Sequence, residues 1–247
     1  MSSKSMLLAL LAVAALSASM TMGRAPGAPP EGESLNTDSH LVGWWKLDEA
    51  SGTQAADASG HGHAGVLGGG LSFDHASAPG RLGKALRFDR GNDAVRIAGY
   101  KGITGTGART VAAWIRTARP QGEIVSWGKP DFGKMWIFGF IRGHVGVTPK
   151  GGYYYMEPTV HDNAWHHVAV VLRAGEPPTL YRHATVYLDG KIAEPDRIGL
   201  LDLWPINTEQ DQDVTLGRGF RGLLDDVRIY DRALSDEEVE ALYRMGK

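Results

Sequence analysis

Apolar and polar residues alternate along most of the chain from Leu41 onward. In Thr110–Arg116 one set of alternate positions is apolar, and His166–Leu172 repeats the arrangement. Because successive side chains of a strand point to opposite faces, this period of two predicts strands that bury one side of a sheet. Asp189-Gly190 predicts a tight hairpin turn, since such turns need residues that accept positive φ. Further alternating stretches are Val42–Leu47, Ala85–Phe88, Ala94–Ile97, Glu123–Trp127, Met135–Ile141, Val145–Thr148, Thr185–Leu188, Val214–Leu216 and Leu223–Tyr230.

One helix is predicted, at the C-terminal end of the chain. Ser235 can accept a hydrogen bond from the first turn, and Glu238, three residues later, completes a capping box. Val239, Leu242 and Tyr243 then form an apolar stripe at helical spacing. Many short strands with no helices between them exclude a doubly wound sheet or a βα-barrel. The expected fold class is therefore an all-β, two-sheet antiparallel sandwich with one short C-terminal helix.

The composition divides the chain into three parts. Residues 1–23 combine Lys4, an apolar run and small residues, which is typical of a secretory signal peptide; a buried helix or an uncleaved membrane anchor is the alternative. Residues 24–40 are rich in Pro, Gly and Ser and predict a flexible linker. Residues 41–247 are expected to form one domain, because sandwiches of this length occur as single units. We therefore expect a secreted, periplasmic or cell-surface protein.

The overall composition excludes several kinds of chemistry. The chain of 247 residues contains no cysteine, which excludes disulfides, thiolate metal sites and a cysteine nucleophile. Its formal net charge of -2 offers no bulk attraction to phosphate backbones, so nucleic acid is not expected as a partner. After cleavage of the signal, no remaining apolar segment is long enough to span a membrane.

Several short motifs follow one another in a fixed order through the predicted domain. They are Gly43–Glu49 (GWWKLDE), Asp57–Gly65 (DASGHGHAG), Gly83–Phe88 (GKALRF), Thr110–Ile115 (TVAAWI), Trp165–Ala169 (WHHVA), Val186–Lys191 (VYLDGK) and Leu224–Tyr230 (LDDVRIY), which runs into Ser235. In this order they resemble laminin-G-like (LamG-like jellyroll) domains of the concanavalin A-like lectin/glucanase superfamily. The resemblance spans Leu41 to Tyr243 and implies a jelly-roll sandwich. This architecture carries lectins, adhesion modules, glycanases and lyases, so the fold alone does not fix the function.

The resemblance also implies a structural calcium ion, which would require about six to eight oxygen ligands. The residues expected to supply them are Asp57, Gly60, His63 and Asp225. Asp225 shares the parity of Val227 in its strand and is expected to lean inward, where a buried carboxylate needs a partner. The alternative is an Asx-turn at Asp57 and an arginine or backbone partner for Asp225. Relatives often have Asn where this chain has His61 and His63, and imidazole nitrogen is a poor calcium ligand. The site is therefore weakened if these side chains ligate in relatives, and unaffected if only their carbonyl oxygens do.

Sugar binding requires aromatic faces that stack on sugar rings, with polar groups that orient the hydroxyls. The segment Asp196–Asp213 is expected to be a long irregular loop, and such loops commonly carry binding residues. Three consecutive tyrosines, Tyr153–Tyr155, are a second candidate. The alternative for them is an edge strand in which the ring of Tyr154 is buried. The predicted ligand-binding residues are Trp136, Tyr153, Tyr154, Tyr155 and Trp204.

No enzyme motif accompanies the predicted fold. Retaining glucanases of this architecture carry an E-x-D-x-x-E strand with two carboxylates about 5–5.5 Å apart, and the chain has no such strand. His166 and His167 are neighbours on a strand and point to opposite faces, so they do not act on one substrate atom. We therefore expect an exported, non-catalytic binding module for a polysaccharide or glycan. The alternatives are a protein-interaction or adhesion domain that binds a surface protein, and a divergent glycan hydrolase or lyase.

Overall fold

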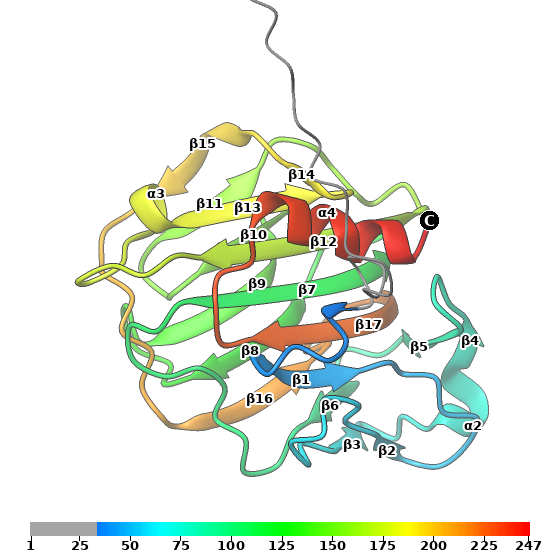
Figure 1. The fold of residues 1–247 in the computed structure, drawn as a ribbon. Coiled ribbons are helices and arrows are strands. Elements are labelled where there is room, and N and C mark those ends of the chain that lie inside the picture. Colours follow the sequence, from blue (N-terminus) through cyan, green and yellow to red (C-terminus); the bar gives the residue numbers. More distant parts are fainter. Residues whose placement is uncertain (1–33) are drawn as a thin grey trace, which may run out of the picture.

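The computed structural model describes residues 34–247, except the side chains of residues 197 and 198, and consists of two antiparallel sheets packed face to face (Figure 1). The eight-stranded sheet has the order β14 (Lys191–Ile192), β13 (Ala184–Leu188), β12 (Trp165–Leu172), β7 (Arg109–Arg116), β17 (Gly222–Tyr230), β5 (Lys84–Phe88) and β4 (Ser77–Pro79), with β1 (Leu41–Trp45) also paired to β17. The nine-stranded sheet has the order β15 (Pro195–Leu201), β11 (Tyr153–Met156), β10 (His144–Thr148), β9 (Met135–Ile141), β8 (Glu123–Gly128), β16 (Gln212–Leu216), β6 (Ala94–Arg96), β3 (Gly65–Gly68) and β2 (Gln54–Ala55). The predicted all-β sandwich is confirmed.

The space between the sheets holds the main core. Val111, Ala113 and Ile115 of β7 point into it, as their alternation predicts. The fully buried indoles of Trp45 and Trp127 fill it from β1 and β8. Removing these apolar surfaces from water is the main favourable contribution to folding.

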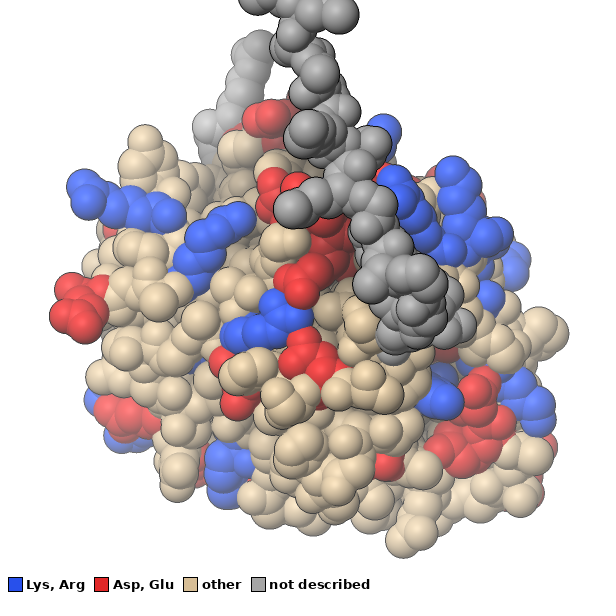
Figure 2. All heavy atoms as spheres, viewed as in Figure 1, with Lys and Arg blue, Asp and Glu red and all other residues tan. Residues whose placement is uncertain are grey.

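A second core lies on the outer face of the eight-stranded sheet, under α4 (Asp236–Met245) (Figure 1). Ala112 of β7 faces outward into it, and Val239 and Leu242 of the helix pack onto it. The predicted capping box begins the helix, with Ser235 and Glu238 each accepting a backbone N–H bond from the other. Charged side chains of both signs are interspersed over this face of the molecule (Figure 2).

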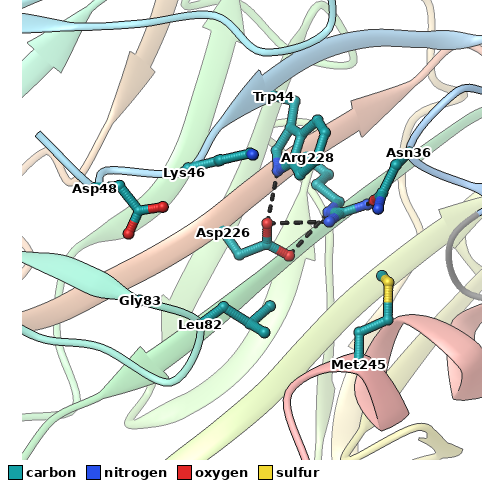
Figure 3. A pocket seen from close by; sticks show the side chains of 9 residues that line it. All are labelled: Asn36, Trp44, Lys46, Asp48, Leu82, Gly83, Asp226, Arg228 and Met245. Atoms are coloured by element: carbon teal, nitrogen blue, oxygen red, sulfur yellow. Dashed lines mark hydrogen bonds and ion pairs between the residues drawn. The ribbon is translucent and has the colours of Figure 1, made fainter.

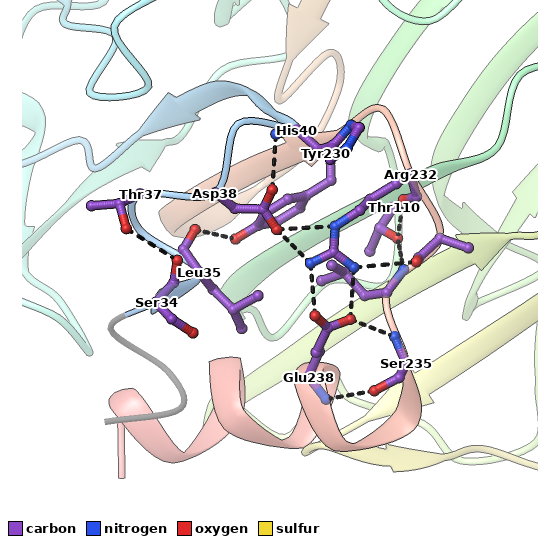
Figure 4. Close-up of polar contacts among 12 residues, drawn as sticks. Ser34, Leu35, Thr37, Asp38, His40, Thr110, Tyr230, Arg232, Ser235 and Glu238 are labelled. Atoms are coloured by element: carbon purple, nitrogen blue, oxygen red, sulfur yellow. Dashed lines mark hydrogen bonds and ion pairs between the residues drawn. The ribbon is translucent and has the colours of Figure 1, made fainter. Parts of the chain in front are cut away.

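Residues 34–40 pack beside this second core, although the composition predicts a linker up to residue 40 (Figure 4). Leu35 is buried. Asp38 accepts a bond of 3.0 Å from Nε of Arg232, which also reaches both carboxylate oxygens of Glu238 at 2.7 Å. The predicted linker boundary is therefore wrong, because ion pairs with distant residues hold a segment whose composition is that of a loop.

Other parts of the predicted organisation lie outside the described residues. These are the signal peptide at 1–23 and the first part of the linker, residues 24–33. Within the described part of the chain, no helix is long and apolar enough to cross a membrane.

The structure contains short elements that the sequence pattern does not reveal. β15 occupies the start of Asp196–Asp213, which was expected to be irregular, and pairs with β11. The strands β2, β3, β4 and β14 have two to four residues each. Two helices, α2 (Phe73–Ala76) and α3 (Leu180–His183), have four. Segments of this length are too short for a period of two or 3.6 to stand out.

The strand β17 changes partner halfway along its length. Its first half pairs with β5 and its second half with β1, and its register against β7 shifts just after Asp225. Asp226 occupies this bulge with a φ of 50°. The extra residue changes which face the following side chains occupy. Leu224 and Val227 thus both point into the main core, whereas Asp225 lies beside Trp114 on the outer face. The predicted inward direction of Asp225 is therefore wrong.

Candidate functional site

Large apolar side chains are exposed at one end of the sandwich, where α3, β15 and the loop after β15 lie (left side of Figure 1). Phe132 is 54% exposed, Trp204 48% and Leu203 61%. Together with Tyr181 and Leu201 they form the surface that we call the aromatic end. Contiguous exposed apolar side chains are uncommon on soluble domains and mark interaction surfaces. The aromatic end is therefore the candidate binding site.

Phe132 and Trp204 form the centre of the aromatic end. Their ring centroids are 5.8 Å apart, and their planes differ by only 6°. Gly151, in the turn after β10, lies against both rings and has a φ of 86°. A Cβ atom at this position would approach Phe132 to 2.6 Å and Trp204 to 2.7 Å. The glycine is thus required for the close approach of the turn to the two rings.

The segment that carries Trp204 is anchored on both sides. The carboxylate of Asp202 accepts N–H bonds from Leu180 at 3.3 Å and Tyr181 at 3.0 Å, at the start of α3. On the other side Ile206 is fully buried in the main core. Anchoring of this kind holds the indole in place before a ligand arrives, which lowers the entropy cost of binding.

Arg109 supports the aromatic end from inside the molecule. Its fully buried guanidinium donates to the carbonyl oxygens of Ile103 at 2.8 Å and Gly107 at 2.9 Å, and to the hydroxyl of Thr208 at 2.9 Å. Burial lowers the pKa of Arg109 to about 9. No carboxylate pairs with it among residues 34–247, so peptide dipoles stabilise its charge. The hydrogen bonds of Arg109 join the loop before β7 to Thr208, in the segment that follows the aromatic end.

Charged groups form one border of the aromatic end. Glu209 pairs with Lys134 at 2.9 Å and with Lys129 at 3.4 Å, and Lys134 also pairs with Asp131 at 3.5 Å. The hydrogen bond from Lys134 lowers the pKa of Glu209 below its usual value, which keeps this carboxylate charged. Exposed rings with hydrogen-bonding groups beside them are the combination that sugar recognition requires.

The structure separates the three tyrosines that were predicted to bind a ligand. They alternate along β11, so Tyr154 points into the main core. Tyr155 is only 2% exposed and stacks on His144 at 5.4 Å. The prediction is wrong for these two, because buried rings present no face to a sugar. Tyr153 is partly exposed, with the guanidinium of Arg142 5.1 Å from its ring, and its binding role stays a prediction.

The two predicted tryptophans have opposite outcomes. Trp136 is fully buried against Trp127, so its predicted binding role is wrong; the period of two in β9 places it on the core face. Trp204 is exposed, as a stacking residue must be, and its binding role stays a prediction. Phe132 was missed by the sequence reasoning. The signal that identifies it is a single aromatic residue in a polar turn, Lys-Pro-Asp-Phe-Gly-Lys, where no strand pattern accounts for it.

The residues predicted to hold calcium do not form a single site. Oδ1 of Asp57 accepts the N–H groups of Trp44 at 3.1 Å and Ser59 at 2.9 Å, and Oδ2 accepts that of His63 at 2.9 Å. Burial opposes ionisation of Asp57, but a hydrogen bond from the Ser59 side chain and these backbone N–H bonds together lower its pKa below the usual value. The carbonyl oxygen of His63 accepts the indole N–H of Trp45 at 2.8 Å. The loop is thus an Asx-type turn whose oxygens serve its own backbone.

The fourth predicted ligand, Asp225, is held by a different loop. Its Oδ2 accepts N–H bonds from Arg81 at 2.6 Å and Leu82 at 2.8 Å, while the buried Oδ1 has no partner among the described residues. Burial raises the pKa of Asp225 to about 7. Gly60 was expected to offer only its carbonyl oxygen, and no group of three or more His, Cys, Asp or Glu residues within 34–247 is placed to hold a metal. The predicted ligand set therefore does not fit calcium, and calcium binding stays a prediction from the resemblance.

A cavity of about 240 Å³ opens on the outer face of the eight-stranded sheet (Figure 3). The indole of Trp44 lines it and donates to Asp226 at 2.6 Å. Arg228 binds both oxygens of Asp226, at 2.8 and 3.1 Å, and donates to Asn36 at 2.7 Å. Because these polar groups satisfy one another, we interpret this cavity as part of the scaffold rather than as a binding site.

The two neighbouring histidines do not form a catalytic pair. His167 is fully buried, and burial lowers its pKa to about 4. Nδ1 of His166 bonds to Asp189 at 3.0 Å and its Nε2 bonds to Asp162 at 3.2 Å. The hydrogen bond with Asp189 raises the pKa of His166, and both of its ring nitrogens are engaged. It is therefore not a free general base.

A family model matches residues 89–240, which are more than half of the chain. It is Laminin_G_3, described as the concanavalin A-like lectin/glucanases superfamily. The chain belongs to this family. The matched region runs from just before β6 into α4 and includes the aromatic end, so the resemblance seen in the sequence motifs is confirmed.

Solved structures share this fold at low sequence identity. Domain 4 of an extracellular arabinanase from Geobacillus stearothermophilus, in complex with arabinotriose, has a TM-score of 0.58 at 20% identity; the match covers 82% of this chain and 98% of that domain. The binding domain of Paraclostridial Mosquitocidal Protein 1 has a TM-score of 0.53 at 16% identity over 83% of this chain. The ligand-binding domain of botulinum neurotoxin serotype D, in complex with N-acetylneuraminic acid, has a TM-score of 0.55 at 15% identity over 87% of this chain. The chain spans 52% of each of these two toxin domains.

These likenesses show the fold alone, since all three identities are below 25%. A comparison with curated proteins found no match.

Proposed function

We propose that this protein is an exported, non-catalytic module that binds carbohydrate through its aromatic end. The observation that carries the proposal is the pair of nearly parallel, half-exposed rings of Phe132 and Trp204. Aromatic faces stack on the C–H faces of sugars, and the charged groups around Glu209 are placed to bond hydroxyls. Two of the structurally similar domains were solved with arabinotriose and with N-acetylneuraminic acid, which supports a sugar as the ligand class.

Titration calorimetry with arabinotriose and a panel of neutral oligosaccharides tests the proposal. Replacing Trp204 or Phe132 with Ala should weaken binding at least about tenfold, which corresponds to 1.4 kcal/mol, because each ring provides a large contact area. Ile192→Ala is the matched control, since Ile192 is 53% exposed on β14 and lies outside the aromatic end. Sugar binding that is unchanged in both aromatic variants would show that the aromatic end is not the binding site.

A protein partner is the second candidate, and the exposed aliphatic residues of the aromatic end favour it. Leu203 is 61% exposed and Leu201 38%, and aliphatic side chains contribute to protein interfaces more than to sugar stacking. Replacing Leu203 with Ser distinguishes the two functions. Under the carbohydrate proposal this variant keeps its affinity for sugar, whereas a protein partner held at this surface would be lost.

The non-catalytic part of the proposal has its own test. Incubation of the protein with a panel of polysaccharides should release no reducing sugar and no unsaturated product. The bonded state of both ring nitrogens of His166 supports this expectation. Release that persists through purification and is removed by a single carboxylate substitution would assign a hydrolase or lyase instead.

Export is proposed from residues 1–23 alone, and the location is secreted, periplasmic or cell-surface. Expression of the full chain in its host, followed by N-terminal sequencing of the protein outside the cytoplasm, tests it. A mature N-terminus between residues 17 and 24 is expected. A protein that stays inside the cell with its first residues intact would contradict export.

A further inference from the structure

A second pocket, of about 350 Å³, lies on the outer face of the eight-stranded sheet at the end opposite the aromatic end. β7 connects the two regions: it begins at Arg109, below the aromatic end, and finishes at Arg116, in the wall of this pocket. Strands β4 and β5, which carry Pro79 and Arg87 of the pocket lining, lie on the right side of Figure 1. We call it the arginine pocket. Its walls include Pro79, Arg87, Asp89, Arg116, Asn163 and Leu223.

Two arginines face each other across the strand β17 in this pocket. Leu223 pairs with Arg87 of β5 on one side and with Arg116 of β7 on the other. Neighbouring strands are about 4.8 Å apart, so the two arginine backbones are separated by about 10 Å. Side chains of this length can bring both guanidinium groups to one anion above Leu223, which forms an apolar floor.

The guanidinium groups have hydrogen-bonding capacity to spare. Nε of Arg116 donates to the carbonyl oxygen of Asn163 at 2.8 Å and more weakly to its Oδ1 at 3.3 Å. This contact fixes the plane of the guanidinium and leaves its two terminal nitrogens without a partner among the described residues. The side chain of Arg87 has no hydrogen bond or ion pair within 34–247. Paired arginines with free N–H groups are the typical receptor for a carboxylate, which they bind with two parallel bonds.

We infer that the arginine pocket binds the carboxylate of an acidic sugar, so that the glycan recognised by this protein contains uronic acid residues. The inference rests on the proposed carbohydrate-binding function and adds a second contact, at the other end of β7 from the aromatic end, which specifies the class of glycan. Asp89 also lines the pocket, and its carboxylate has no partner in the described part of the chain. It can accept bonds from sugar hydroxyls, and it repels a doubly charged anion such as phosphate more strongly than a singly charged carboxylate. Leu223 and Pro79 offer apolar surface to the C–H face of the sugar.

The experiment compares polygalacturonate with its fully methyl-esterified form, which has the same chain without the negative charges. Affinity electrophoresis and calorimetry measure binding to wild type, Arg87→Gln, Arg116→Gln and the control Arg244→Gln. The control removes the same charge from an exposed position on α4, outside the pocket. Wild type should bind the free acid at least about tenfold more tightly than the ester, and each pocket variant should lose about tenfold toward the acid only. Arg87→Gln breaks no hydrogen bond or ion pair of the described chain, so its melting temperature should equal that of wild type, which separates a loss of binding from a folding defect.

The outcomes separate this inference from the proposed function. Equal binding of acid and ester by wild type, or full binding by Arg87→Gln, overturns the arginine pocket as a carboxylate site. Binding of arabinotriose that depends on Trp204, without any binding of polygalacturonate, also overturns it and leaves the proposed function intact. Loss of every sugar ligand overturns the proposed function instead. Dextran sulfate is the last ligand to be tested. If it binds more tightly than polygalacturonate and with the same dependence on Arg87 and Arg116, the pocket binds anions in general, and its assignment as a carboxylate site is overturned.

Discussion

The buried ion pair of Arg228 and Asp226, on the outer face of the eight-stranded sheet, and the aromatic end differ in whether their side chains are satisfied by the protein itself. On the outer face, the ion pair of Arg228 and Asp226 is almost inaccessible, with side-chain exposures of 2% and 6%, and every part of it is bonded to protein. At the aromatic end, Phe132 and Trp204 leave about half of their surface in water although neighbouring loops hold them firmly. Charged groups whose hydrogen bonds are all made within the protein thus mark the scaffold, whereas apolar rings left exposed to water mark the contact surface.

The largest expected effect lies in the buried pair. Replacing Arg228 with Ala leaves Asp226 buried with only the indole of Trp44 as a side-chain partner, so the free energy of unfolding should fall by about 3–5 kcal/mol. Urea denaturation at pH 7, followed by tryptophan fluorescence, measures this change. Arg244→Ala is the control, because the ion pair between Arg244 and Glu240 is exposed and should contribute less than about 0.5 kcal/mol.

Equal losses of unfolding free energy in Arg228→Ala and Arg244→Ala would show that the buried pair stabilises the protein no more than an exposed pair does. The comparison with the aromatic end would then have no basis in stability. A loss in Arg228→Ala that is fully restored by the additional change Asp226→Asn would strengthen it, since that change removes the uncompensated charge.

The second effect depends on pH and concerns Asp225. Burial raises its pKa to about 7, above the value of about 3.9 expected in the unfolded chain. Between these values the folded protein holds a proton that the unfolded chain releases, so the contribution of Asp225 to stability is lost as the pH rises from about 4 to about 7. Asp225→Asn cannot ionise. Its stability relative to wild type should therefore increase by about 1 kcal/mol per pH unit across this window.

His167 provides a matched test with the opposite sign. Burial lowers its pKa to about 4, below the ordinary value of about 6.5, so its contribution to stability is lost as the pH falls through this range. His167→Gln should therefore gain stability relative to wild type on acidification, whereas Asp225→Asn gains on going to neutral pH. Thermal unfolding at half-unit steps from pH 4 to pH 7.5 measures both slopes. Parallel profiles for wild type and both variants would contradict the assigned burial of these groups.

The third expected effect is a small change in the free energy of unfolding. Trp204→Ala removes a half-exposed ring and should lower the free energy of unfolding by less than about 1 kcal/mol, even where sugar binding is lost. Trp136→Ala, in the main core, should cost about 3–5 kcal/mol in the same urea assay. A large loss in Trp204→Ala would show that the exposed indole is part of the scaffold, and the aromatic end would have to be reinterpreted.

Much of this fold could be predicted from the sequence, because a period of two directly reports the burial of one sheet face. β7 and β12 were recognised for this reason, as was the capping box at Ser235. The bulge at Asp226 was not recognised, since no local pattern records a left-handed residue inside an otherwise regular strand. One inserted residue was enough to reverse the expected direction of Asp225.

The errors at the candidate site and near the N-terminus have a shared cause. The bond between Asn36 and Arg228 joins residues 192 positions apart, and the composition of the first segment carries no sign of it. Trp204 was recognised because it is an aromatic residue in a segment expected to be a loop. Phe132 and Trp204 become a pair only when two turns meet over Gly151, which is a tertiary contact and not a sequence pattern.

The smallest expected effect is that of calcium. The melting temperature should be the same with saturating calcium and with a chelator, because both oxygens of Asp57 already accept N–H bonds and Asp225, in β17, is bonded to the separate loop at Arg81 and Leu82. Asp57→Ala should lower the melting temperature equally in both conditions, since it removes the acceptor of the turn. An ion that binds only the folded state would raise the melting temperature by mass action. An increase that Asp225→Ala abolishes would therefore restore the metal that the sequence resemblance implies, with the unpartnered Oδ1 of Asp225 as its ligand.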